Sequence, residues 1–177
     1  MSVPSITLFA GVALAILSCR SPSSTQEPKG AIIPPQGGDQ VQIGTGSHPL
    51  LIKVDPATTG SQGLFAFQLT LGPSDSLPVH RHHRDDELFF VHTGGVTALV
   101  GDERKSAPAG TTLFIPAGTP VGLENPGTAT AVLLVIFAAP HMAEYIRSLG
   151  HAPGTAPPSL SDDELEEIRK RHYITFP

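Results

Sequence analysis

The stretch PVHRHHRDDELFFVHTGG, residues 78–95, places four histidines and several acids ahead of an apolar run. His80 and His82 alternate along an extended segment, so both side chains point to the same side. After a short charged turn, Glu87 begins the next apolar strand. Two imidazoles and one carboxylate that converge from neighbouring strands predict a site for a divalent first-row metal ion.

The other polar residues of this stretch are expected to stay out of the site. His83 points away from His82 in an extended segment, which predicts a surface residue or one that supports the site from behind. His92 falls on the opposite strand face from Glu87 and is expected outside the core. One of the two preceding aspartates could replace Glu87 if the turn were one residue tighter. Taken alone, the stretch is almost equally consistent with a polar hairpin tip that binds nothing.

Strand-forming runs dominate the middle of the chain. They are short, rich in Val, Ile, Phe, Thr and Leu, and separated by Gly, Pro, Asn or Asp: VQIG, PLLIKV, GLFAFQLTL, ELFFVHTGG, VTALVG, TTLFIPAG and TAVLLVIFAA. This spacing predicts an antiparallel sandwich or barrel. The run at 131–139 is apolar at every position, so we expect both of its faces to be covered, the outer one by a helix or a second subunit.

Two short helices are expected after the last strand, on the outside of the sheet. The segment MAEYIRSLG, residues 142–150, places Met142, Tyr145 and Ile146 on one stripe. Ser161 and Glu164 form a capping box at the start of the second helix. The predicted fold class is therefore all-β with peripheral helices: a β-barrel over residues 41–139, followed by a helical tail over residues 140–177.

The N-terminal residues are predicted to be a targeting segment. Residues 1–18 read as a signal peptide, because their apolar run is too short to span a bilayer comfortably. Cys19 is the single cysteine of the chain and follows Ile-Leu-Ser, an ending that resembles a bacterial lipobox. Residues 19–40 are rich in Ser, Pro, Gly and Gln, which predicts a flexible tether. We therefore expect an exported lipoprotein, anchored to a membrane of the bacterial cell envelope through Cys19.

Composition excludes some partners. The chain has 177 residues, enough for one domain with a sizeable core, and a formal net charge of −5. It contains no basic stripe that would neutralise phosphates and release counterions. We therefore expect no nucleic-acid partner.

Two motifs resemble those of the cupin superfamily. The first is HxH, four residues, Glu, six residues, Gly, from His80 to Gly94; the second is Gly, five residues, PxG, then Asn, from Gly110 to Asn125. The resemblance implies a jelly-roll β-barrel that holds a divalent Fe, Mn, Ni or Zn ion inside through His80, His82 and Glu87. The tail, closing on HYITFP, looks like that of small single-domain cupins similar to the quercetin dioxygenase-like group.

The second motif departs from the family at one position. Val121 stands where the family usually has its fourth ligand, a histidine, and Val cannot bind a metal. With Phe89, Val91 and Leu123 it is expected to line a mostly apolar ligand pocket. Two consequences stay open: either the remaining two-His-one-carboxylate set still binds metal, as in non-haem iron enzymes, or the pocket binds its ligand without metal.

Three functional classes follow. The first is an exported metalloenzyme, an oxygenase or isomerase acting on a small organic acid, polyol or phenolic compound; the second is a lipid-anchored protein that binds a small ligand; the third is a structural lipoprotein, which the retained His-x-His and Glu disfavour. Outward-facing Leu88 and Phe90 suggest a homodimer joined through the sheet. Metal binding is expected to weaken as the pH falls toward the ordinary histidine pKa of ~6.5.

Overall fold

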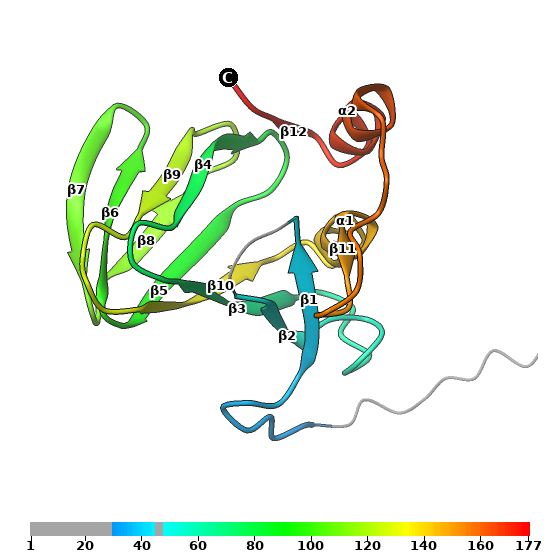
Figure 1. Cartoon of the computed structure of the whole chain (residues 1–177), viewed down its shortest axis with the longest axis horizontal. Helices are drawn as coiled ribbons and strands as arrows, with labels where there is room; N and C mark the ends of the chain where they lie inside the picture. Colours follow the sequence, from blue (N-terminus) through cyan, green and yellow to red (C-terminus); the bar gives the residue numbers. More distant parts are fainter. Residues whose placement is uncertain (1–29, 45–47) are drawn as a thin grey trace, which may run out of the picture.

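A computed structural model describes residues 30–44 and 48–177 of the chain. Antiparallel strands make up most of it, and two short helices follow the last long strand (Figure 1). The elements, in chain order, are β1 (Asp39–Ile43), β2 (Leu50–Val54), β3 (Phe65–Leu71), β4 (Ser76–His82), β5 (Glu87–Thr93), β6 (Gly95–Val100), β7 (Glu103–Pro108), β8 (Thr112–Ile115), β9 (Val121–Glu124), β10 (Ala131–Phe137), α1 (Met142–Leu149), β11 (Gly150–His151), α2 (Asp162–Arg171) and β12 (Ile174–Thr175).

The strands form two sheets that face each other across a shared apolar core. One sheet has the order β11-β1-β2-β3-β10-β5-β8 and the other the order β12-β4-β9-β6-β7. Figure 1 shows them as two layers joined at one end by the hairpin connections around β5 and β6. Among the described residues the two sheets do not close into one hydrogen-bonded cylinder. The predicted all-β class with helices after the strands is confirmed, as an open jelly roll rather than a closed barrel.

Alternation along β10 shows where the core sits. Leu133 and Val135 are fully buried on the inner face, whereas Leu134 and Ile136 are only half-buried on the outer face. The two faces alternate because successive side chains of a strand point to opposite sides of the sheet. The expectation that both faces of this strand are covered therefore holds only for the inner face within this chain.

The outer face of the larger sheet carries an apolar patch, here called the outer patch. In the strand registers, Leu134 and Ile136 of β10 lie opposite Phe90 and Leu88 of β5, and Leu88 in turn lies opposite Phe114 of β8. Phe114 is 58% exposed. The sequence predicted this patch but left open whether a helix covers it.

The helices do not cover the outer patch. The main contacts of α1 are with β1, β11 and α2, and α2 packs mainly against β12. Met142, Ala143 and Tyr145 of α1 belong to the apolar core instead. The two helices follow the strands, as predicted, and α1 packs beside β1 with its apolar face toward the core (Figure 1).

An ion-pair network fixes α1 in this position. The guanidinium of Arg147 donates to Asp55, whose carboxylate is fully buried, at 2.7 Å and to Asp39 at 2.8 Å. Burial alone would raise the pKa of Asp55, but hydrogen bonds from Thr58 and Arg147 outweigh it and hold that pKa below its ordinary value. These ion pairs therefore attach α1 to β1 and to the loop after β2.

Two motif residues without a metal-binding role shape the turns around the core. The side-chain amide of Asn125 is buried and donates to the carbonyl oxygens of Leu71, Gly72 and Ala129, which joins three segments. Gly94 has a φ of 71°, and a Cβ there would lie 2.7 Å from the carbonyl oxygen of Thr130. Only glycine fits that position without strain.

The predicted signal peptide, Cys19 and the first part of the tether lie outside the described residues. In the part of the chain that the structure describes, no helix is long and apolar enough to cross a membrane.

Candidate metal centre

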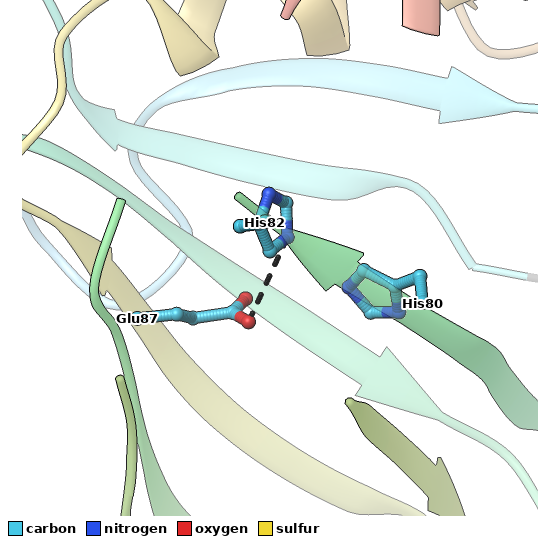
Figure 2. Close-up of side chains that lie close together, drawn as sticks. All are labelled: His80, His82 and Glu87. Carbon is cyan, nitrogen blue, oxygen red and sulfur yellow. Dashed lines mark ion pairs between the residues drawn. The ribbon is translucent and has the colours of Figure 1, made fainter. Parts of the chain in front are cut away.

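His80, His82 and Glu87 come together inside the jelly roll. One ligand atom from each, two ring nitrogens and a carboxylate oxygen, lie within 4.8 Å of one another. Figure 2 shows the two imidazoles on β4 facing the carboxylate that reaches across from β5. We call these three residues the triad, and they are the ones that the sequence singled out.

Strand geometry explains why these three residues converge. Along β4 the buried side chains are His80 and His82, and the intervening Arg81 is exposed, as the alternation of a strand requires. Glu87 is the first residue of β5, where it lies opposite Phe137 of β10 and Ile115 of β8. Its carboxylate is only 3% exposed. The carboxylate is therefore buried and directed toward the histidines instead of toward solvent.

A backbone contact orients one of the two imidazoles. Nδ1 of His80 lies 2.8 Å from the carbonyl oxygen of Pro78. A carbonyl oxygen only accepts, so Nδ1 carries the proton and Nε2 keeps its lone pair. An imidazole held in this way is prepared to bind a metal ion through Nε2.

The other two members of the triad leave polar atoms unsatisfied. Nε2 of His82 lies 3.7 Å from Oε2 of Glu87, too far for a hydrogen bond. Among the described protein atoms, neither Nδ1 of His82 nor Oε2 of Glu87 has a hydrogen-bond partner, although both are buried. Burying such groups without partners costs free energy. A cation between the three side chains would give the Glu87 oxygen a partner and use two nitrogen lone pairs, so the donor set fits a metal ion.

Burial also decides the charge state of the site. It raises the pKa of Glu87 to about 8 and, with the neighbouring His80, lowers the pKa of His82 to about 3. Burial likewise lowers the pKa of His80, despite an opposing contribution from the Pro78 carbonyl. Near neutral pH both imidazoles are therefore neutral, which is the form that coordinates metals, whereas Glu87 must lose a proton first.

The residues predicted to line a ligand pocket form a packed wall. Phe89 and Val91 on β5, and Val121 and Leu123 on β9, are all buried in the apolar core. Val121 is directly opposite His80 in the register of β4 with β9. The ring of Phe137 meets His82 edge-on at a centroid distance of 4.9 Å. The inner side of the triad is therefore apolar and closely packed.

The remaining polar residues of the first motif lie away from the triad, as expected. His83 and His92 are exposed. The carboxylate of Asp86 accepts a hydrogen bond from the backbone N–H of Ala117 at 2.9 Å, and Asp85 pairs with His141 at 3.1 Å. The two aspartates are thus engaged in holding the turn and do not replace Glu87.

Sequence reasoning missed one neighbour of the triad. The ring of Phe176 stacks on His80 with a centroid distance of 5.7 Å and an interplanar angle of 27°. It is brought there by β12, which pairs with β4 at the position of His82. The aromatic residues of the closing HYITFP were the only signal, and nothing local in the sequence indicates which strand they join.

A separate cavity of about 410 Å³ lies outside the triad, at the junction of the β4–β5 turn with the two helices. Most of its lining is charged or polar: Arg84, Asp85, His141, Glu144, Arg171, His172 and Tyr173. It shares no residue with the predicted apolar pocket. The cavity therefore does not stand in for a ligand site at the triad.

Comparison with known proteins places the fold. Residues 67–137 match the family described as "Cupin domain". Over 77 residues the chain is 27% identical to mannose-1-phosphate guanylyltransferase 2 of Escherichia coli O157:H7, a match that covers 44% of this chain. The chain spans only 16% of the length of that curated relative.

Solved structures are similar to this chain over part of its length. KdgF from Halomonas sp. superposes with a TM-score of 0.54 at 16% identity, covering 63% of this chain and 96% of that one. TT1209 from Thermus thermophilus has a TM-score of 0.43 at 29% identity, covering 49% of this chain and 81% of that one. The jelly roll is of the cupin type, and the family match together with this fold supports the cupin superfamily for the chain.

Proposed function

We propose that this protein is an exported, lipid-anchored cupin that binds one divalent first-row metal ion through His80, His82 and Glu87. The observation that carries the proposal is the convergence of three buried donors within 4.8 Å of one another, together with the unpartnered Oε2 of Glu87, which faces Nε2 of His82. Core positions that served packing alone would be expected to carry apolar side chains. Two nitrogens and one oxygen suit Fe, Mn, Ni or Zn better than Ca or Mg, which prefer oxygen ligands.

The reaction we propose is metal-dependent chemistry on a small organic molecule, of the oxygenase or isomerase kind. With three protein ligands, a bound ion keeps coordination positions open and would polarise an oxygen atom of the substrate. The protein side chains contribute positioning: the neighbouring walls, including Val121 and Phe137, are apolar and fully or almost fully buried. Such walls favour a molecule with an apolar body and one or two oxygen donors, such as a phenolic compound. We therefore propose a relationship to the quercetin dioxygenase-like cupins.

A second candidate function rests on Val121. This residue is 0% exposed and lies directly opposite His80, where the family usually supplies a further ligand. An apolar side chain there makes the wall more suitable for an apolar ligand than for a metal complex. The alternative is therefore a lipid-anchored protein that binds a small molecule without metal and without catalysis.

Two further parts of the proposal concern assembly and location. The outer patch is apolar, and neither α1 nor α2, the two helices in the described part of the chain, packs mainly on it, so we propose that it joins two copies in a homodimer. The ending Ile-Leu-Ser-Cys at Cys19 supports lipid attachment and a place in the bacterial cell envelope.

Metal content tests the central claim. The purified protein, stripped with a chelator and reloaded, should take up one Mn, Fe, Ni or Zn ion per chain, measured by elemental analysis and titration. His82→Ala and Glu87→Gln should abolish uptake, because each leaves only two donors. His83→Ala is the matched control, since its exposed imidazole lies next to the site and is not among the three converging ligands.

The same titration separates the two candidates. Uptake that requires His82 and Glu87 supports the metal-dependent function. If the parent protein and the three variants all bind no metal, the metal-free binding protein is the correct account.

A further inference from the structure

Residues 172–177, here called the strap, run beside the triad, and their Phe176 stacks on His80. Within the strap, β12 pairs with β4 at Ile174 opposite His82 and at Thr175 opposite Arg81. Figure 1 shows β12 leaving the end of α2 and running beside β4. The strap is therefore the edge strand next to the strand that carries both histidines.

The strap is anchored at its base and exposed at its tip. His172 and Ile174 are buried, and the backbone N–H of His83 donates to the carbonyl oxygen of Tyr173 at 2.8 Å. Phe176, near the tip, is 37% exposed. A strand held by so few backbone pairs opens at a lower free energy than the interior of a sheet. Movement of the tip does not require the buried base to unfold.

Two contacts of the Phe176 ring, together with a hydrogen bond between Nε2 of His83 and Oγ1 of Thr175 at 2.8 Å, hold the tip closed. The ring of Phe176 stacks on His80, and the guanidinium of Arg169 on α2 lies over the same ring, 4.7 Å from its centroid. Each contact is weak and reversible at an exposed position. The closed position is thus one that thermal motion can leave and regain.

The ring of Phe176 covers His80 from a side that is partly exposed to solvent, whereas two other neighbours of the histidines belong to the core. His82 contacts Phe137, and His80 lies opposite Val121, and both neighbours belong to the packed core. Phe176 is far more exposed than either of these two neighbours. Displacing a half-exposed ring costs less than opening a close-packed interior. The path from solvent to the triad therefore runs past Phe176.

We propose that Phe176 is the gate and the size-selecting residue of the triad, a role that rests on the proposed metal binding. With the ring on His80, the site is closed. When the tip moves away, a metal ion or a ligand reaches the triad. The phenyl ring offers no donor atom, so it should set the rates of entry and exit and leave the metal affinity unchanged.

Exchange of Co²⁺ alone tests the gate. Uptake by the metal-free protein and release to excess chelator are followed by absorbance in a stopped-flow instrument. In Phe176→Ala both rates should rise by roughly tenfold, as expected for loss of one ring stack and one cation–π contact, while their ratio stays the same. Phe114→Ala, which removes an exposed ring of the outer patch, should change neither rate.

A second pair of variants tests whether Arg169 holds the Phe176 ring in the closed position. Arg169→Ala should accelerate both rates in the same direction as Phe176→Ala, because it removes the cation over the ring. Lys170→Ala is the matched control, since this neighbouring cation pairs with Glu167 on the same helix.

The outcomes separate the gate from the site itself. If the parent protein binds no Co²⁺, the proposed function fails and the gate fails with it. If Co²⁺ binds and the rates in Phe176→Ala equal those of the parent, the gate is wrong and the metal site stands. A change in the ratio of the two rates would also overturn the gate, because it would make Phe176 part of the binding equilibrium.

Size selection has its own test on the Co²⁺-loaded protein. Azide is small enough to pass a partly opened ring, whereas catechol is a planar ring that needs the space of Phe176. Phe176→Ala should therefore accelerate catechol binding far more than azide binding. Equal acceleration of the two, or no catechol binding by either protein, would overturn the size-selecting role.

Discussion

Val121 lies directly opposite His80 in the pairing of β4 with β9, and its side chain is fully buried. The pair links the first cupin motif to the second at the point where a further metal ligand is missing. A histidine at this position would start from a strand already in register with His80. The apolar residue therefore accounts for a triad in place of four ligands.

Restoring the missing donor should strengthen metal binding. We expect Val121→His to lower the Kd for Zn²⁺ by at least about tenfold, since even residues that only support a ligand change affinity by this amount. Competition with a chromophoric chelator measures the Kd. Val121→Thr, which has a similar volume and no imidazole, is the control for added polarity and should gain nothing. A Kd that is unchanged in Val121→His would show that β9 does not present this position to the ion.

The pH dependence of metal binding should follow Glu87 and not the histidines. The sequence suggested weakening toward ~6.5, the ordinary histidine pKa. In the structure the pKa of His82 is lowered to about 3 and burial also lowers the pKa of His80, so both imidazoles are neutral near pH 7. Burial raises the pKa of Glu87 to about 8, so binding below that pH must displace its proton. Affinity should rise by about tenfold per pH unit up to about pH 8 and level off above it.

Calorimetry in buffers of different ionisation enthalpy checks this dependence. Near neutral pH, about one proton should be released for each Zn²⁺ bound. In the metal-free protein the stability of the fold changes with pH in the opposite direction to the metal affinity. A raised pKa stabilises the fold while Glu87 is protonated, and this contribution declines as the pH rises from 4.5 through about 8. Binding without proton release, and with the same affinity at about pH 6 and 8, would mean that Glu87 is already ionised.

The triad could be predicted from the sequence because its geometry is local. His80 and His82 are two positions apart on one strand, and Glu87 follows after a short turn, so the pattern alone places them on one face. The position of Val121 needed the second motif, and the register of β4 with β9 agrees with it.

The strap and the particular strands that each helix contacts could not be predicted because they depend on contacts between distant segments. β12 has two residues, too few for any periodicity, and only tertiary packing selects β4 as its partner. The amphipathic stripe of α1 correctly indicated a buried face, but a stripe does not specify which surface buries it. Strand β7, ERKSAP, was missed because its side chains are nearly all exposed and show no apolar alternation.

Lipid attachment predicts a simple change in location. Replacing Cys19 with Ala should release the protein from membranes or leave the precursor unprocessed, because the thiol that carries the lipid is gone. Fractionation of cells that express the parent and the variant, with immunoblotting for size, measures both outcomes. Ser18→Ala keeps the thiol and a small residue before it, and should stay in the membrane fraction. A processed Cys19→Ala protein that remains in the membrane fraction as fully as the parent would rule out lipid anchoring at Cys19.

The outer patch predicts a dimer that a single charge should disrupt. Phe114 lies next to Leu88 across β5 and β8, and it is the most exposed of the large apolar side chains in the patch. We expect the protein without its predicted signal peptide and the first part of its predicted tether, beginning at Gly30, to sediment as a dimer. Phe114→Glu should yield monomers without loss of fold, since a carboxylate at an exposed position costs little in the monomer and much in an apolar interface.

Leu64→Glu is the matched control for this experiment, because Leu64 is a similarly exposed apolar residue that precedes β3 and lies outside the outer patch. Circular dichroism of each variant verifies that the fold is kept. Two monomeric variants and a monomeric parent at high concentration would show that the outer patch does not join two copies. Dimers in the parent and in Leu64→Glu, with monomers in Phe114→Glu alone, would place the interface on the strands that lie behind the triad.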